Sequence, residues 1–179
     1  MTRVRVDRTL ASRVQEAALL EGDFVLSSGK KSRFYVDKYL FSTEPDLLRD
    51  LAYEISAKLP TNTQRLAGVE LGAVPLVTAV ALHSGLSYVI VRKATKEYGT
   101  GNRIEGRPLE VGERVVLIED VVTTGAQALR AAEIIEETEA KVLGILAVLD
   151  RREEGSAYLR GYPFGALLGM QDLVVAGQD

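Results

Sequence analysis

Residues 114–126 read Arg114-Val-Val-Leu-Ile-Glu-Asp-Val-Val-Thr-Thr-Gly-Ala126. The stretch predicts a buried strand, then two carboxylates, Glu119 and Asp120, and then Thr123-Thr124-Gly125 at the start of a helix. Backbone N–H groups at a helix start bind anions, and a glycine there lets the anion approach closely. Two carboxylates would repel a bare phosphate, but they suit a ligand with hydroxyl groups or a metal ion beside its phosphate. The pattern therefore indicates a ribose 5-phosphate site, with a plain strand-to-helix turn as the simpler alternative.

Short apolar strands alternate with helices from Arg65 onward. The expected strands cover 66–69, 88–91, 115–118 and 142–149, and the expected helices cover 75–83 and 126–138. Continuous apolar strands separated by helices predict an α/β fold, with a central, mostly parallel sheet and helices on both faces. Ligands of such sheets bind outside the carboxyl ends of the strands, where the two carboxylates lie.

The segment before this pattern, residues 1 to about 64, predicts a small N-terminal lobe. Its expected elements are a helix over 7–21, strands over 24–26 and 33–37, and a helix that Thr43 caps and Pro60 ends. No repeat or linker separates the lobe from the α/β core over about 65–179. The 179 residues are therefore expected to form a single domain.

Composition argues against several classes of protein. The chain has no cysteine and one histidine, His83, so disulfides are excluded and a metal site built from protein ligands is disfavoured. The formal net charge of -3 disfavours nucleic-acid binding. No apolar run approaches the roughly 20 residues of a membrane span, and the start lacks the apolar stretch of a signal peptide. These features fit the reducing cytoplasm, with His83 as a surface or helix-capping residue.

The 114–126 stretch resembles the diphosphoribose-binding signature of the type I phosphoribosyltransferases. The resemblance implies the type I phosphoribosyltransferase fold, in which a small N-terminal hood accompanies the α/β core. It also implies that phosphoribosyl diphosphate binds with Mg²⁺ and that a nitrogen of a base displaces diphosphate from C1 of the ribose. The residues implied to bind phosphoribosyl diphosphate here are Glu119, Asp120, Val121, Val122, Thr123, Thr124, Gly125, Ala126 and Gln127.

A second segment, residues 91–106, begins with cations and continues into a glycine-rich loop. Such a loop is long enough to close as a lid, and its cations can stabilise a departing diphosphate. A solvated basic loop is the plain alternative. The segment is similar to the lid of the orotate phosphoribosyltransferases, which implies a homodimer whose lids reach into the neighbouring site. The lid residues implied to bind the diphosphate are Arg92, Lys93, Lys96 and Tyr98, the last of which stands where the family usually has histidine.

Two further segments resemble the same family. Residues 68–75 resemble its diphosphate loop, in which Gly72 would let backbone amides approach the diphosphate. Many relatives carry lysine at this place, and a purely structural turn is an equal alternative. Residues 148–155 follow a strand, and the resemblance assigns Arg151 to the carboxylate of orotate, which a guanidinium binds with two hydrogen bonds. Arg152 is expected to lie on the surface.

Residues 26–35 resemble the family's hood segment, whose turn and aromatic pair cover the orotate. Ser27 stands where many relatives have lysine, which removes one expected cation near the base. A place among core aromatics is an equal alternative for Phe34 and Tyr35. The residues implied to contact orotate are Ser27, Phe34, Tyr35, Thr123 and Arg151.

These resemblances together imply one reaction, the transfer of a phosphoribosyl group to orotate in the de novo synthesis of UMP. The expected catalytic residues are Lys96, Asp120 and Glu119. Mg²⁺ is expected to enter with the diphosphate of the substrate, and Asp120 is the candidate protein ligand. The expected partners are the two substrates and a second copy of the chain, with neither nucleic acid nor membrane.

Two other functions stay open. A purine phosphoribosyltransferase would share the fold and the signature, although a purine has no carboxylate for Arg151 to bind. A regulator that senses phosphoribosyl diphosphate and binds nucleic acid would also share the fold. The negative charge and the presence of both acids disfavour a regulator, whereas the unusual Tyr98 leaves it open.

Overall fold

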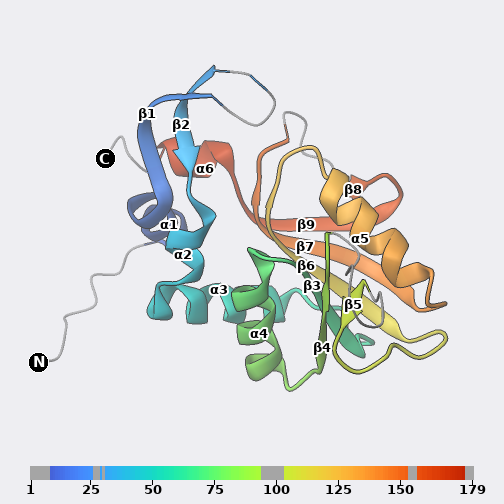
Figure 1. Ribbon diagram of the computed structural model, residues 1–179. Helices are drawn as coiled ribbons and strands as arrows, with labels where there is room; N and C mark the ends of the chain where they lie inside the picture. The colour runs from blue at the N-terminus through green and yellow to red at the C-terminus, as the bar shows by residue number, and fades with distance from the viewer. Residues whose placement is uncertain (1–8, 26–28, 30, 94–102, 153–156, 176–179) are drawn as a thin grey trace, which may run out of the picture.

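The computed structural model describes residues 9–25, 29, 31–93, 103–152 and 157–175 (Figure 1). Its centre is a seven-stranded sheet in the order β5-β4-β3-β6-β7-β9-β8, and a second sheet pairs β1 with β2. The inner strands of the large sheet are parallel, while β5 and β8 pair antiparallel at its edges. The strands are β1 (Leu19–Val25), β2 (Lys31–Val36), β3 (Arg65–Val69), β4 (Tyr88–Val91), β5 (Ile104–Glu105), β6 (Arg114–Val122), β7 (Lys141–Asp150), β8 (Tyr158–Leu159) and β9 (Tyr162–Gly169).

Helices cover both faces of the large sheet (Figure 1). On one face, Leu66 and Val116 pack with buried side chains of α3 and α4. On the other face, the next residues along the same strands, Ala67 and Leu117, pack with α5. Successive side chains of a strand point to opposite faces, so strands buried on both faces are apolar throughout. The helices are α1 (Leu10–Ala18), α2 (Lys38–Ser42), α3 (Pro45–Ala57), α4 (Ala73–Ser84), α5 (Ala126–Glu136) and α6 (Met170–Val175).

The connections of the sheet diverge between β3 and β6. β3 leads through α4 to β4 on one side, whereas β6 leads through α5 to β7 on the other. Because β3 and β6 are parallel neighbours, their carboxyl ends open at the same edge. Open α/β sheets bind their ligands at such a topological switch point. The predicted α/β fold with a mostly parallel sheet is confirmed, and the acidic pair lies at the switch point.

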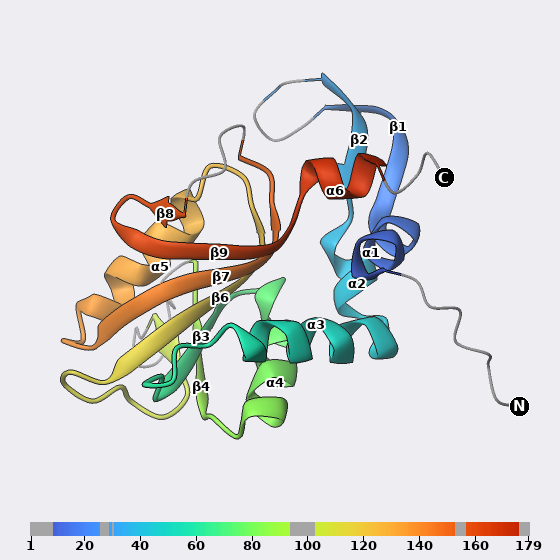
Figure 2. The same ribbon diagram turned by 180° about the vertical axis from the view of Figure 1, so that it is seen from behind.

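A lobe of α1, β1, β2, α2 and α6 lies at one end of the sheet (Figures 1 and 2). The backbone N–H of Asp37 donates to the carbonyl of Ala18 (2.9 Å), which ties the end of β2 to the end of α1. Asp37 also caps α2, since its Oδ1 accepts the N–H of Tyr39 (3.0 Å). α6 follows β9 in the sequence but packs against α1, and its Leu173 is fully buried. The lobe therefore combines segments from before and after the sheet.

Two predictions in the lobe are wrong. The first helix ends at Ala18 rather than at residue 21, because residues 19–21 already pair with β2. Thr43 does not cap α3: its hydroxyl donates to the carbonyl of Tyr39 at the end of α2 (2.6 Å), and Glu44 is the N-cap residue.

Two predictions in the core differ from the structure as well. The strand expected over 115–118 continues through the acidic pair, and Val121 and Val122 pair with Leu149 and Asp150 of β7. The segment after residue 150, for which no strand is expected, forms β8 and β9.

Candidate active site

Two buried carboxylates mark the candidate site at the end of β6. Glu119 exposes 5% and Asp120 exposes 2% of its surface. The Oδ1 of Asp120 accepts the N–H of Val121 (2.6 Å), and its Oδ2 lies 2.9 Å from the Nζ of Lys38 in α2. Burying two adjacent carboxyl groups is costly, and such groups gather at functional sites. Lys38 is a site residue that the sequence pattern does not predict.

The two carboxyl groups differ in charge. Burial and the neighbouring Asp120 raise the pKa of Glu119 to about 8, so Glu119 holds its proton at neutral pH. Burial disfavours the charged form of Lys38, but the hydrogen bond and the charge of Asp120 outweigh it and raise the pKa of Lys38. An ammonium–carboxylate pair therefore lies beside a neutral carboxylic acid. The carboxylate can accept a hydrogen bond and the acid can donate one, which suits two neighbouring hydroxyl groups.

The turn after β6 presents donors at the same edge. Gly125 has a φ of 79°, and a Cβ there would lie 2.5 Å from a side chain of β8, so this position requires glycine. α5 begins at Ala126, whose N–H donates to the Oγ1 of Thr124 (3.3 Å). Since Thr123 and Thr124 are exposed, the turn can surround an anion.

The loop after β3 approaches the acidic pair at Gly72. A Cβ on Gly72 would lie 1.7 Å from the Oδ2 of Asp120 and 2.8 Å from the Nζ of Lys38. In the same loop, the peptide bond between Glu70 and Leu71 is cis. The close neighbours of Gly72 are thus an ammonium and a carboxylate of the protein, and any side chain at this position would displace them.

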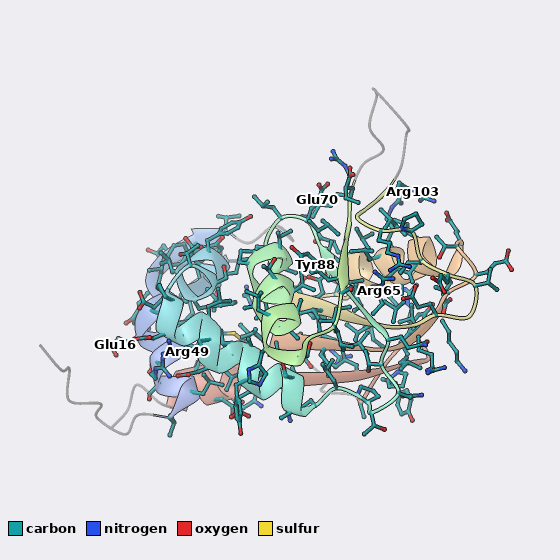
Figure 3. The ribbon with its side chains drawn as sticks, turned by 90° about the horizontal axis from the view of Figure 1, so that it is seen from below. Glu16, Arg49, Arg65, Glu70, Tyr88 and Arg103 are labelled. Atoms are coloured by element: carbon teal, nitrogen blue, oxygen red, sulfur yellow. The ribbon has the colours of Figure 1, made fainter. Side chains whose placement is uncertain are left out.

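The predicted lid starts beside this loop. The backbone N–H of Lys93 donates to the Oε1 of Glu70 (2.7 Å), and Figure 3 shows Glu70 beside the end of β4. The guanidinium of Arg92 lies 3.9 Å from the Oε2 of Glu70 and 3.5 Å from the Oε1 of Glu105. Arg92 is therefore half-buried between two carboxylates, whereas Lys93 is exposed. Glu70 therefore links the loop after β3 to the end of β4, where the predicted lid begins.

The two arginines after β7 have different surroundings. The prediction that Arg152 is a surface residue is wrong: its guanidinium binds both carboxylate oxygens of Asp150 (2.8 and 2.9 Å) and lies 4.1 Å above the ring of Phe164. Arg151 donates its backbone N–H to the carbonyl of Val122 (2.8 Å). Its guanidinium has no partner among the described residues. An unpaired guanidinium at this edge suits the carboxylate of a ligand.

The aromatic pair of the hood lies in β2. Tyr35 exposes 41% of its surface, and its ring centroid is 5.4 Å from that of Phe24. Phe34 is half-buried. Because neighbouring side chains of a strand point to opposite faces, a planar base on one face of the hairpin meets one of the two rings. Three other predicted site residues lie outside the described residues, namely Ser27, Lys96 and Tyr98.

A metal ion would have few protein ligands here. In the described ranges, no three Asp, Glu or His side chains gather into a group that could hold a metal ion. Asp120 is a carboxylate oxygen donor, and Mg²⁺ commonly binds one or two carboxylates together with substrate phosphates. Asp120 therefore fits Mg²⁺ that a diphosphate carries, whereas the protonated Glu119 does not. None of the helices in the described ranges combines the length and apolarity that crossing a membrane requires.

Comparison with known proteins defines the family. The family model of the phosphoribosyl transferase domain matches residues 43–159 of this chain. An orotate phosphoribosyltransferase of Thermococcus gammatolerans is 44% identical over 173 residues, which cover 94% of this chain and 91% of that protein. One of Halobacterium salinarum is 46% identical over 157 residues, covering 87% of this chain and 89% of that protein.

The chain belongs to the orotate phosphoribosyltransferase family. A solved orotate phosphoribosyltransferase of Aeropyrum pernix superposes with a TM-score of 0.81 at 28% identity, covering 96% of this chain and 99% of that chain. The orotate phosphoribosyltransferase of Mycobacterium tuberculosis H37Rv, in complex with 5-phospho-α-D-ribosyl 1-diphosphate, gives a TM-score of 0.71 at 29% identity. The match covers 92% of this chain and 96% of that chain. The predicted family and the type I phosphoribosyltransferase fold are confirmed, and the chain is a phosphoribosyltransferase enzyme.

Proposed function

We propose that this member of the orotate phosphoribosyltransferases transfers the phosphoribosyl group of phosphoribosyl diphosphate to orotate, for pyrimidine nucleotide synthesis. The supporting observation is that a buried acidic pair and a donor-rich turn lie together at the switch point. Arg151, whose guanidinium has no partner among the residues that the structure describes, follows the neighbouring strand β7. A ribose phosphate can bind the acidic pair through its hydroxyl groups and the turn through its phosphate. The carboxylate of orotate can bind Arg151, whereas a purine base has no carboxylate.

The acidic pair and the turn hold the ribose phosphate. The 5-phosphate binds the hydroxyl groups and amides of residues 123–127. Asp120 accepts a hydrogen bond from one ribose hydroxyl, while the protonated Glu119 donates to the other. Because both carboxyl groups are buried in a strand, they fix the orientation of the sugar before the reaction.

The reaction exchanges one bond at C1 of the ribose. The bond from C1 to the diphosphate oxygen breaks, the bond from C1 to N1 of orotate forms, and the N1 proton leaves to solvent. Negative charge grows on the departing diphosphate, and cations on a closed lid stabilise it. Mg²⁺, when bound, neutralises part of this charge. In this proposal Lys93, Lys96 and Tyr98 meet the diphosphate, and Arg92 anchors the lid through Glu70.

Orotate lies between the hood and the end of β7. Arg151 binds its carboxylate as a planar fork, which orients N1 toward C1. Thr123 and Ser27 supply further hydrogen-bonding groups, and Phe34 or Tyr35 covers the face of the ring.

The active form in this proposal is a homodimer in which the lid of one subunit completes the site of its partner. Mixing Lys96→Ala and Asp120→Asn proteins tests this arrangement, since each subunit would supply what the other lacks. Recovery of activity on mixing supports shared sites. Two inactive variants that stay inactive after unfolding and refolding together would exclude them.

A direct assay tests the function. Mixing the protein with orotate, phosphoribosyl diphosphate and Mg²⁺ is expected to lower the absorbance of orotate and to produce orotidine 5′-phosphate, identified by mass. The matched control replaces orotate with adenine or hypoxanthine, for which no nucleotide is expected. Turnover of a purine without turnover of orotate would establish the purine alternative instead.

A further inference from the structure

Lys38 reaches the acidic pair from a fixed position in the lobe. It is the first residue of α2, directly after Asp37, which caps this helix and is bonded to the end of α1. Phe41 and Ser42 of the same short helix are buried, and α2 contacts β6. The ammonium is therefore presented by a helix held at both ends, unlike that of a surface lysine.

The ammonium lies between the acidic pair and the loop after β3. Its Nζ is 2.9 Å from the Oδ2 of Asp120 and 2.8 Å from the point that a Cβ on Gly72 would take. The side chain of Asp120 is 3% exposed, whereas that of Lys38 is 30% exposed. An ammonium has three N–H donors. Since Asp120 uses one of them, donors remain on the side that solvent and ligands can reach.

The loop itself offers no positive charge. Residues 69–73 read Val-Glu-Leu-Gly-Ala, so the one charge in the loop is the negative Glu70. Arg92 is already engaged with Glu70 and Glu105. A diphosphate at this loop would meet the carboxylates of Glu70 and Asp120 and would need a nearby cation to offset their repulsion. Besides the exposed Lys93 at the end of β4, Lys38 is the cation that the described structure places directly against Gly72.

We propose that Lys38 binds the diphosphate group of the substrate and that glycine at position 72 is what admits it to the site. This inference rests on the proposed function. Lys38 keeps one donor on Asp120 and turns another to the diphosphate, so a single ammonium joins the leaving group to the acid that holds the ribose. The two residues depend on each other, because a side chain at position 72 would displace the ammonium of Lys38 from the site.

Three variants separate this role from a purely structural one. Lys38→Gln keeps an N–H donor for Asp120 but removes the charge, Lys38→Arg keeps the charge, and Lys58→Gln removes the charge of an exposed lysine at the end of α3. Inorganic diphosphate with Mg²⁺ serves as the probe in calorimetry. Lys38→Gln is expected to weaken diphosphate binding about tenfold or more, the size of one lost charged hydrogen bond. Lys38→Arg is expected to retain most of the affinity, and Lys58→Gln all of it.

Kinetics give a second readout. In Lys38→Gln the KM for phosphoribosyl diphosphate is expected to rise by a similar factor, while the KM for orotate stays within about twofold. A folded Lys38→Gln protein with unchanged diphosphate affinity would overturn the inference and leave Lys38 as a structural partner of Asp120.

The wild-type protein provides a test that does not depend on the folding of a variant. Amine-reactive labelling followed by mass spectrometry is expected to show that diphosphate with Mg²⁺ slows the labelling of Lys38 but not that of Lys58. Equal labelling with and without diphosphate would contradict the inference. Neither diphosphate experiment requires turnover of orotate, so failure of the proposed function is seen separately, in the orotate assay.

Discussion

Replacing Glu119 with glutamine is expected to stabilise the protein, and to do so more strongly as pH rises. Burial and Asp120 raise the pKa of Glu119 from its ordinary 4.5 to about 8. Between these values the unfolded chain has lost a proton that the folded protein still holds. Rising pH therefore favours unfolding, and the stability linked to this group is lost between the two pKa values. Glutamine has nearly the shape of the neutral acid and no proton to lose.

The size of the effect follows from the two pKa values. Each pH unit between 4.5 and about 8 is worth about 1.4 kcal/mol. The full difference is therefore up to about 5 kcal/mol at high pH, an order-of-magnitude figure. Solvent screens this term weakly because Glu119 is only 5% exposed.

Urea unfolding of the wild type and of Glu119→Gln, from about pH 5 to about pH 9, measures the difference. The variant is expected to gain little at the acid end and several kcal/mol at the alkaline end. Glu54→Gln, on the exposed side of α3, is the matched control and should give a flat difference. A flat difference for Glu119→Gln, or a loss of stability at alkaline pH, would refute the reasoning.

Three further substitutions test other parts of the site. Gly72→Ala places a Cβ 1.7 Å from the Oδ2 of Asp120, so it should raise the KM for phosphoribosyl diphosphate and lower the free energy of unfolding by about 1–3 kcal/mol; normal values for both would contradict the packing. Arg151→Gln should raise the KM for orotate roughly tenfold to a hundredfold with little loss of stability, whereas Arg152→Gln should chiefly lower the melting temperature. If the two arginines exchanged these effects, their assignment would be wrong. Lys96→Ala should lower kcat about a hundredfold in single-turnover measurements, and a near-normal chemical rate would remove Lys96 from the lid.

The parts of the fold that the sequence predicts are those with local patterns. Strands buried on both faces are continuous apolar runs, so β3, β4, β6 and β7 are all expected close to their observed places. The acidic pair and Gly125 stand out because carboxylates at the end of an apolar strand and a glycine before a helix are unusual together. Local chemistry suffices to locate this half of the site.

The other half depends on contacts between distant segments. Lys38 is an ordinary lysine after a strand until α2 packs against β6, and no nearby residue signals its pairing with Asp120. Arg152 resembles a surface charge in sequence, although Asp150 is only two residues away, because the ring of Phe164 reaches it only through the pairing of β7 with β9. The sequence does not predict β9 because it contains Pro163 and glycines, which are unfavourable inside strands.

The lobe that carries Lys38 is discontinuous in sequence, since α6 packs against α1 only after the whole sheet has been translated. During synthesis on the ribosome, the first helix and hairpin therefore emerge without the neighbour that covers them. The ion pair between Lys38 of α2 and Asp120 of β6 joins this lobe to the sheet. A chain that ended before residue 170 would lack α6, and the side of α1 that α6 covers would be bare in the lobe that presents Lys38.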